Sequence, residues 1–83
     1  MRTVRTIISG IEVVMEMLGG GDGGPNVATR LRLPLGEREA EATLDELLAT
    51  GALTAQARSG PSPVPVDSST IQRIDEWCMQ YAP

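Results

Sequence analysis

A glycine-rich run, GGGDGGP at residues 19–25, is the feature that most restricts how this 83-residue chain can fold. Glycine releases a helix into left-handed conformations, and the proline that ends the run blocks a helical restart before it. A phosphate-binding loop would need a strand before the run and a Lys-Ser/Thr pair after it, and neither is predicted here. We therefore interpret the run as a flexible connector that follows an N-terminal element.

A helix is predicted before this connector, over residues 1–18. Apolar residues recur there at steps of three and four from Val4 to Leu18, which is the spacing of one helix face. Val13 and Met17 widen that face, so we expect the helix to be buried on more than one side or to cover a partner. Gly10 within the segment is only a modest cost for a helix.

Two further helices are predicted after the connector. A short one is expected over residues 26–33, because Asn26 is suited to cap it and Pro34 disfavours a helical residue before it. The next is expected over residues 37–50, where Gly51 is well placed to cap the C-terminus. The inner face of that helix would consist of Ala40, Leu44, Leu47 and Leu48.

The pattern then changes to alternation of apolar and polar residues, which indicates a strand. Turn-forming Ser, Gly and Pro residues follow, and a second strand returns with Pro65, a residue tolerated at a sheet edge. A hairpin is therefore expected over residues 52–66. A last helix is predicted over residues 67–82, and one side of it carries Ile71, Ile74, Trp77, Cys78 and Tyr81.

The charge balance and residue usage limit the functions open to this chain. Its basic residues are all Arg, and eleven acids leave a formal net charge of −4. This balance opposes loose, charge-driven binding to nucleic acid and suits a basic protein partner. Without His there is no ordinary proton carrier at neutral pH, and Cys78 on an apolar helix face is more simply explained by packing. We expect no catalysis, metal, cofactor or small-molecule substrate.

The cellular location is predicted from cysteine usage and hydropathy. A single cysteine allows no internal disulfide, which is atypical of a small secreted module. Glu12 and Glu16 interrupt the apolar stretch that a signal peptide would need, and no segment is long enough to span a bilayer. We therefore expect a cytoplasmic protein without membrane contact. The use of Arg without Lys suggests a GC-rich bacterial or phage genome.

The predicted order of elements is helix, short helix, turn, helix, hairpin, helix. With the segment VATRLRLP at residues 27–34 and the Leu-x-x-Leu-x-x-x-Gly-x-Leu run at residues 44–53, the chain resembles the winged-helix superfamily over roughly residues 4–66. The resemblance implies one mainly α domain with a small β-hairpin. It would contain a helix-turn-helix at 26–50, a wing at 52–66 and an added C-terminal helix.

The resemblance implies a DNA-binding transcription regulator whose third helix enters the major groove. The candidate DNA contacts are Arg30, Arg32, Arg38 and Arg58. However, Glu37, Glu41 and Asp45 occupy outward positions of that helix, where carboxylates are repelled by phosphates. The arginines could instead pair with nearby acids on a solvated surface. The alternative is therefore an acidic protein-interaction module, or a phage-type inhibitor, that binds a basic surface of a nucleic-acid-handling protein.

The apolar side of the last helix also has two interpretations. It could close the core of its own domain, as terminal helices of small domains usually do. It could instead pair with a second copy, since winged-helix regulators often pair through added terminal helices and a small core gains from association. The interface candidates are Ile71, Ile74, Trp77, Cys78 and Tyr81, and a homodimer is expected.

Overall fold

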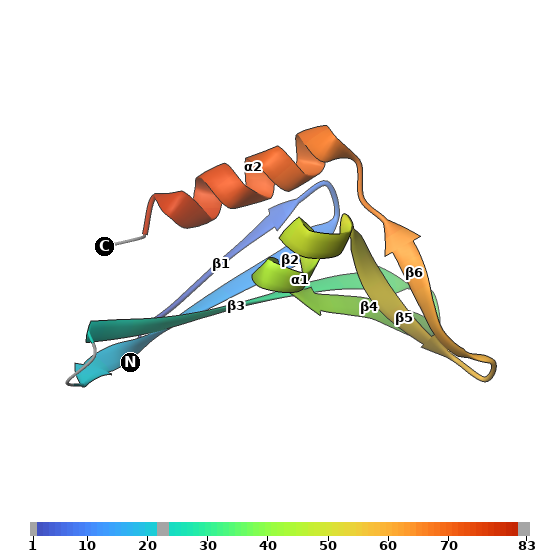
Figure 1. Cartoon of the computed structure of the whole chain (residues 1–83), viewed down its shortest axis with the longest axis horizontal. Helices are drawn as coiled ribbons and strands as arrows, with labels where there is room; N and C mark the ends of the chain where they lie inside the picture. Colours follow the sequence, from blue (N-terminus) through green and yellow to red (C-terminus); the bar gives the residue numbers. More distant parts are fainter. Residues whose placement is uncertain (1, 22–23, 82–83) are drawn as a thin grey trace.

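The computed structural model describes residues 2–21 and 24–81 and shows a six-stranded antiparallel sheet with two helices (Figure 1). The order of strands in the sheet is their order in the sequence, so the chain forms a meander. The elements are β1 (Arg2–Ile8), β2 (Ile11–Gly21), β3 (Gly24–Leu35), β4 (Arg38–Thr43), α1 (Leu44–Thr50), β5 (Ala52–Ala57), β6 (Gly60–Pro65) and α2 (Ser68–Met79).

The expectation of a mainly α, winged-helix fold is therefore wrong, beginning with the helix predicted over residues 1–18. That segment forms the hairpin β1–β2, which turns at Ser9 (φ 51°) and Gly10 (φ 80°). Two successive residues with positive φ are what a two-residue hairpin turn requires. Eight of the twelve residues from Thr3 to Val14 are β-branched, and such side chains favour a pleated sheet over a helix.

The short helix predicted over residues 26–33 is likewise a strand, because that segment belongs to β3. Its residues alternate Arg30, Leu31, Arg32, Leu33, which places the leucines on one face and the arginines on the other. Pro34 is tolerated in this inner strand because the pairing of β2 with β3 reaches only to Arg32. The missing N–H therefore costs no hydrogen bond to β2.

The helix predicted over residues 37–50 forms only in its last seven residues, as α1, and the part before it is strand β4. Thr43 begins the helix with a capping box, in which its side chain accepts from the Glu46 N–H and the Glu46 carboxylate accepts from the Thr43 N–H. Gly51 ends it at φ 71°. The described residues 2–21 and 24–81 therefore contain no helix-turn-helix.

The structure has strands β5 and β6 where the hairpin at 52–66 was expected, and helix α2 within 67–82. The hairpin is no separate wing, because β5 also pairs with β4 and so extends the sheet. Helix α2 is capped by Asp67, whose side chain accepts from the backbone N–H of Thr70 at 3.2 Å. The glycine-rich run lies where β2 turns into β3, with Gly21 opposite Gly24 and residues 22 and 23 outside the described part.

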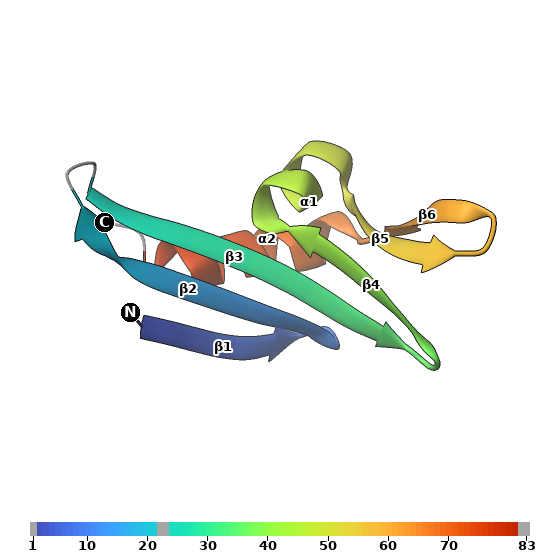
Figure 2. The same cartoon turned by 90° about the horizontal axis from the view of Figure 1, so that it is seen from below.

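Both helices pack on the same face of the sheet, and the core lies between them and the strands (Figures 1 and 2). Each strand contributes the alternate residues that point toward the helices. The buried hydrophobic residues are Ile8, Ile11, Val13, Met15, Leu31, Ala40, Leu47, Leu53, Ala55, Ile74 and Cys78. Within residues 2–21 and 24–81, the opposite face of the sheet carries no helix, and this helix-free face is the surface on which charged side chains gather.

Candidate interaction surface on the helix-free face

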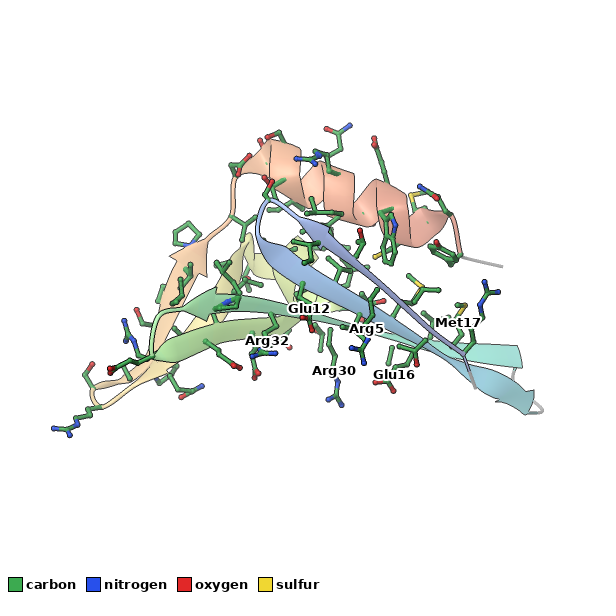
Figure 3. The ribbon with its side chains drawn as sticks, turned by 180° about the vertical axis from the view of Figure 1, so that it is seen from behind. Arg5, Glu12, Glu16, Met17, Arg30 and Arg32 are labelled. Atoms are coloured by element: carbon green, nitrogen blue, oxygen red, sulfur yellow. The ribbon has the colours of Figure 1, made fainter. Side chains whose placement is uncertain are left out.

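The helix-free face is formed by the strand residues that alternate with the core residues. Figure 3 shows Arg5, Glu12, Glu16, Arg30 and Arg32 on the side of the ribbon away from α2. These five residues come from β1, β2 and β3, and the strand registers extend the same face to Glu39, Glu41, Thr43, Thr54 and Gln56. The meander thus brings acids and arginines from neighbouring strands onto one surface.

In one row across the strands of this face, the charges alternate from Glu12 to Arg32 to Glu41. The register places Arg32 opposite Glu12 on one side and opposite Glu41 on the other, and its guanidinium forms an ion pair with Glu39. The hydrogen bond and charge of Glu39, together with Glu12 and Glu41, raise the pKa of Arg32. Arg32 is therefore surrounded by carboxylates. Opposite charges facing each other across strands stabilise a sheet modestly, since the groups are exposed.

A shallow depression of about 650 Å³ lies on this face over β2 to β5 and reaches Glu46 of α1. Its lining includes four glutamates and two arginines, so acids are in excess. The charged lining residues are Glu12, Arg30, Arg32, Glu39, Glu41 and Glu46. The rest of the lining is apolar or uncharged and polar, with Val14, Leu31, Ala42, Thr43, Thr54 and Gln56. The depression is thus an acidic, rigidly supported surface that can hold positively charged or hydrogen-bonding groups.

The four arginines predicted to contact DNA are separated by the structure. Arg30 and Arg32 lie together on β3, in the acidic depression. Arg38 begins β4 beside the β3–β4 turn, and Arg58 lies in the β5–β6 turn. All four side chains are exposed, but two of them share their surface with an excess of glutamates. The arginines do not form the basic patch that phosphate binding needs.

The residues proposed as an interface on α2 mostly serve the core of the chain itself. Ile74 and Cys78 are 0% and 6% exposed, whereas Ile71, Trp77 and Tyr81 are partly buried against the core. The rings of Trp77 and Tyr81 meet edge to face, with centroids 5.2 Å apart. Helix α2 therefore closes its own domain.

Cys78 is a free thiol with a packing role. Burial raises its pKa, and the negative charge of Asp75 raises it further. At neutral pH the group is a protonated thiol, which is a poor nucleophile and a poor metal ligand. Within the described residues, no group of three or more Cys, Asp or Glu side chains could hold a metal ion.

A second hollow, of about 540 Å³, lies between α1 and α2 above β2 and β3. It is lined mainly by apolar groups, among them Met15, Val27, Leu44 and Met79, with Asp45 and Asp75 at the helices. Its other polar lining residues are Thr29, Arg30 and Thr43. The depression on the helix-free face is lined by more charged side chains than this hollow.

Sequence reasoning missed Glu12, Glu39 and Glu41 as surface partners of Arg32. A usable signal was the alternation in EREAEAT at residues 37–43, which is a strand pattern like that of β3. The identity of the charge partners depends on strand register, which one sequence does not state.

The class that this geometry defines is a small antiparallel meander with two helices on one face and a charged, open second face. The chain matches no known protein-family model, no curated protein and no solved structure. None of the helices in the described part of the chain has the length and apolar character needed to cross a membrane.

Proposed function

We propose that this chain is a protein-interaction module that binds a basic segment of a partner protein in the depression on its helix-free face. The observation that carries the proposal is the excess of glutamates there, Glu12, Glu39 and Glu41 from the strands and Glu46 from α1, against two arginines. Complementary charge speeds the approach of such a partner and selects against acidic surfaces.

The sheet gives this surface the stiffness that recognition needs. Glu39 and Glu41 lie on one strand and point to the same side, and cross-strand pairing fixes their distance from Arg32. An Arg or Lys side chain of the partner would add a positive charge beside the glutamates of the row Glu12, Arg32 and Glu41. Thr43, Thr54 and Gln56 offer further hydrogen bonds to an incoming backbone or side chain.

Two other functions receive less support from the site. DNA recognition through a helix and wing lacks its helix-turn-helix, and glutamates around Arg30 and Arg32 oppose phosphate. Catalysis would need an activated nucleophile or a proton carrier, and the chain has no His. A single cysteine allows no internal disulfide, which suits a reducing compartment such as the cytoplasm, and we propose that the interaction takes place there.

The test is an NMR titration of the chain with a short Arg-rich peptide, with the same peptide carrying Glu in place of Arg as a charge control. We expect amide shifts confined to β2–β5, and no shifts with the acidic peptide. The double variant Glu39→Gln, Glu41→Gln should weaken binding at least about fivefold, because two attractive charges are lost.

The matched control is Glu76→Gln on α2, which removes one exposed carboxylate from the helical face. Equal affinity losses per removed carboxylate in the Glu39/Glu41 and Glu76 variants would show that only net charge matters, and would overturn the proposal. In a mobility-shift assay with random duplex at low salt, we expect no shift at micromolar protein. A clear shift would favour DNA binding instead.

A further inference from the structure

The two edges of the sheet differ in their ability to pair with another strand. At one edge, β6 carries Pro61, Pro63 and Pro65 at alternate positions. The Val66 N–H donates to the Gly51 carbonyl at 2.9 Å, so even-numbered residues along this segment face β5. The three prolines therefore face outward. Because proline has no N–H, this edge offers no donors and is closed to strand addition.

At the other edge, β1 has unused hydrogen-bonding groups. Ile8 and Ile11 flank the two-residue turn and form a hydrogen-bonded pair, so even-numbered residues of β1 face β2. The N–H and C=O groups of Thr3, Arg5 and Ile7 then point outward. Figure 2 shows that α2 lies on the β2 side of β1, so the outer side of β1 is free within the described chain. Pairing with β2 runs without a bulge from Arg2 to Ile8.

We propose that β1 pairs with β1 of a second copy of this chain, antiparallel and with Thr6 opposite Thr6 of that copy. Three symmetric registers, centred on Val4, Arg5 or Thr6, pair at least two of the outward residues Thr3, Arg5 and Ile7 of each copy. Centring on Arg5 would place two guanidinium groups directly opposite, which is unfavourable. Centring on Val4 would leave Ile7 without a facing strand residue from the described part of the other copy. Centring on Thr6 avoids both problems.

Among the side chains whose exposure the structure describes, the register centred on Thr6 also covers the most exposed large apolar one. Ile7 is 70% exposed on the helix-free face. In the paired sheet it lies opposite Arg5 of the other copy, whose alkyl stem can cover it. The Arg5 guanidinium then extends toward Glu12, the neighbour of that Ile7. Each copy makes this contact once, so the arrangement is self-complementary.

The closed edge at β6 is consistent with a second copy as the partner of β1, because it limits the assembly to two chains. Pairing of two β1 strands leaves only proline-bearing edges at the outer ends of the joined sheet. The assembly therefore stops at two copies and does not continue as a fibre. This inference concerns the edge of the sheet and shares only Glu12 with the depression proposed to bind a partner, so the two proposals are tested separately.

The first test is sedimentation equilibrium of the whole chain over a wide concentration range. Because the paired segment is short, we expect a weak dimer, with the average mass rising from 8.8 kDa toward twice that value between about 5 and 500 μM. Arg5→Pro removes an outward N–H that no internal pair uses, so the variant should fold and stay monomeric. The control, Pro63→Ala at the closed edge, should dimerise as the wild type does.

The second test determines the register without relying on proline. In a Cys78→Ala background, Thr6→Cys places two sulfurs at a pair with Cα atoms about 4.5 Å apart, within disulfide range. Mild oxidation should cross-link this variant at least about tenfold faster than Arg5→Cys or Val4→Cys, whose partners lie too far away. A monomer at every concentration, or equal cross-linking of the three variants, would overturn the proposal.

Discussion

Ser9 is the residue on which two distant parts of the chain meet. Its backbone holds φ 51° in the β1–β2 turn, a region where non-glycine residues are uncommon. Its hydroxyl oxygen accepts from Arg73 Nη1 at 3.2 Å and lies 3.3 Å from Thr70 Oγ1, both on α2. The strain of the turn and the docking of α2 therefore involve the same side chain.

The variant Ser9→Ala keeps the unfavourable φ and removes both contacts to α2. We expect the free energy of unfolding to fall by about 1–2 kcal/mol, because Thr70 is buried and loses a polar neighbour. Urea unfolding followed by circular dichroism measures this change. Ser62→Ala on exposed β6 is the control and should leave stability almost unchanged, so equal effects would contradict the role assigned to Ser9.

Asp67 gives the chain a specific response to acid. Hydrogen bonds from the hydroxyls of Ser69 and Thr70, and from the Thr70 N–H, lower its pKa to about 2. The carboxylate is favoured in the folded state, so its stabilisation is present above the ordinary Asp pKa near 4 and is lost as pH falls toward 2. Asp67→Asn should lack this part of the pH dependence in unfolding experiments.

An NMR titration checks the cause of this shift directly. Ser69→Ala removes the donor with the largest effect, so the pKa of Asp67 should rise toward its ordinary value. An unchanged pKa in that variant would assign the effect to the Thr70 hydrogen bonds and the helix N-terminus instead.

Among the elements, α1 is the one that depends most on its surroundings. A seven-residue helix does not persist alone in water, because nucleation costs more than so few hydrogen bonds return. The Thr43 capping box, the Gly51 cap and the buried Leu47 hold it in place. Local residues define its ends, and the core defines its position.

Substitutions of two neighbouring leucines in α1 measure how much burial in the core contributes to holding the helix. Leu47 is 0% exposed and Leu48 is 49% exposed. Leu47→Ala should lower the free energy of unfolding by about 2–4 kcal/mol through lost burial and a cavity. Leu48→Ala should change it by less than about 0.5 kcal/mol, as alanine suits a helix surface. Thermal or urea unfolding of both variants makes the comparison, and similar losses would show that α1 is not anchored by Leu47.

The helices and strands differ in how well they could be predicted from the sequence. Residues 52–66 carry alternation and turn residues, and Gly51 marks a helix end, so those features were readable. The first hairpin was not readable, because the core-facing positions change at its two-residue turn, from even-numbered residues in β1 to odd-numbered residues in β2. Val4, Ile8, Ile11 and Met15 point toward the core in the sheet, yet their spacing of four, three and four also fits one face of a helix.

For the candidate surface, the sequence indicated some of the charged residues but not which of them lie next to one another. Arg30 and Arg32 were identified as exposed, but as possible contacts to DNA. Their glutamate neighbours come from β2 and β4, and the pairing of Arg32 with Glu12 and Glu41 follows from two strand registers. Register depends on turn geometry and on which face is buried, so it emerges only when the whole sheet is assembled.

At the scale of the whole molecule, the two faces of the sheet differ in what they contact. One face contributes the aliphatic core beneath α1 and α2, and the other remains charged and open. A one-sided core is a modest source of stability for 83 residues. The alternating charges keep the second face soluble without a covering layer.

The meander also has a kinetic consequence. Each strand pairs with the next one in the sequence, so every strand pair can form by closing a short loop. Folding rates fall as contacting residues become more distant in sequence, which makes most β-rich domains slow. This chain should reach its native state quickly for a protein made largely of strands, leaving its open β1 edge and apolar core side chains exposed to misassembly for only a short time.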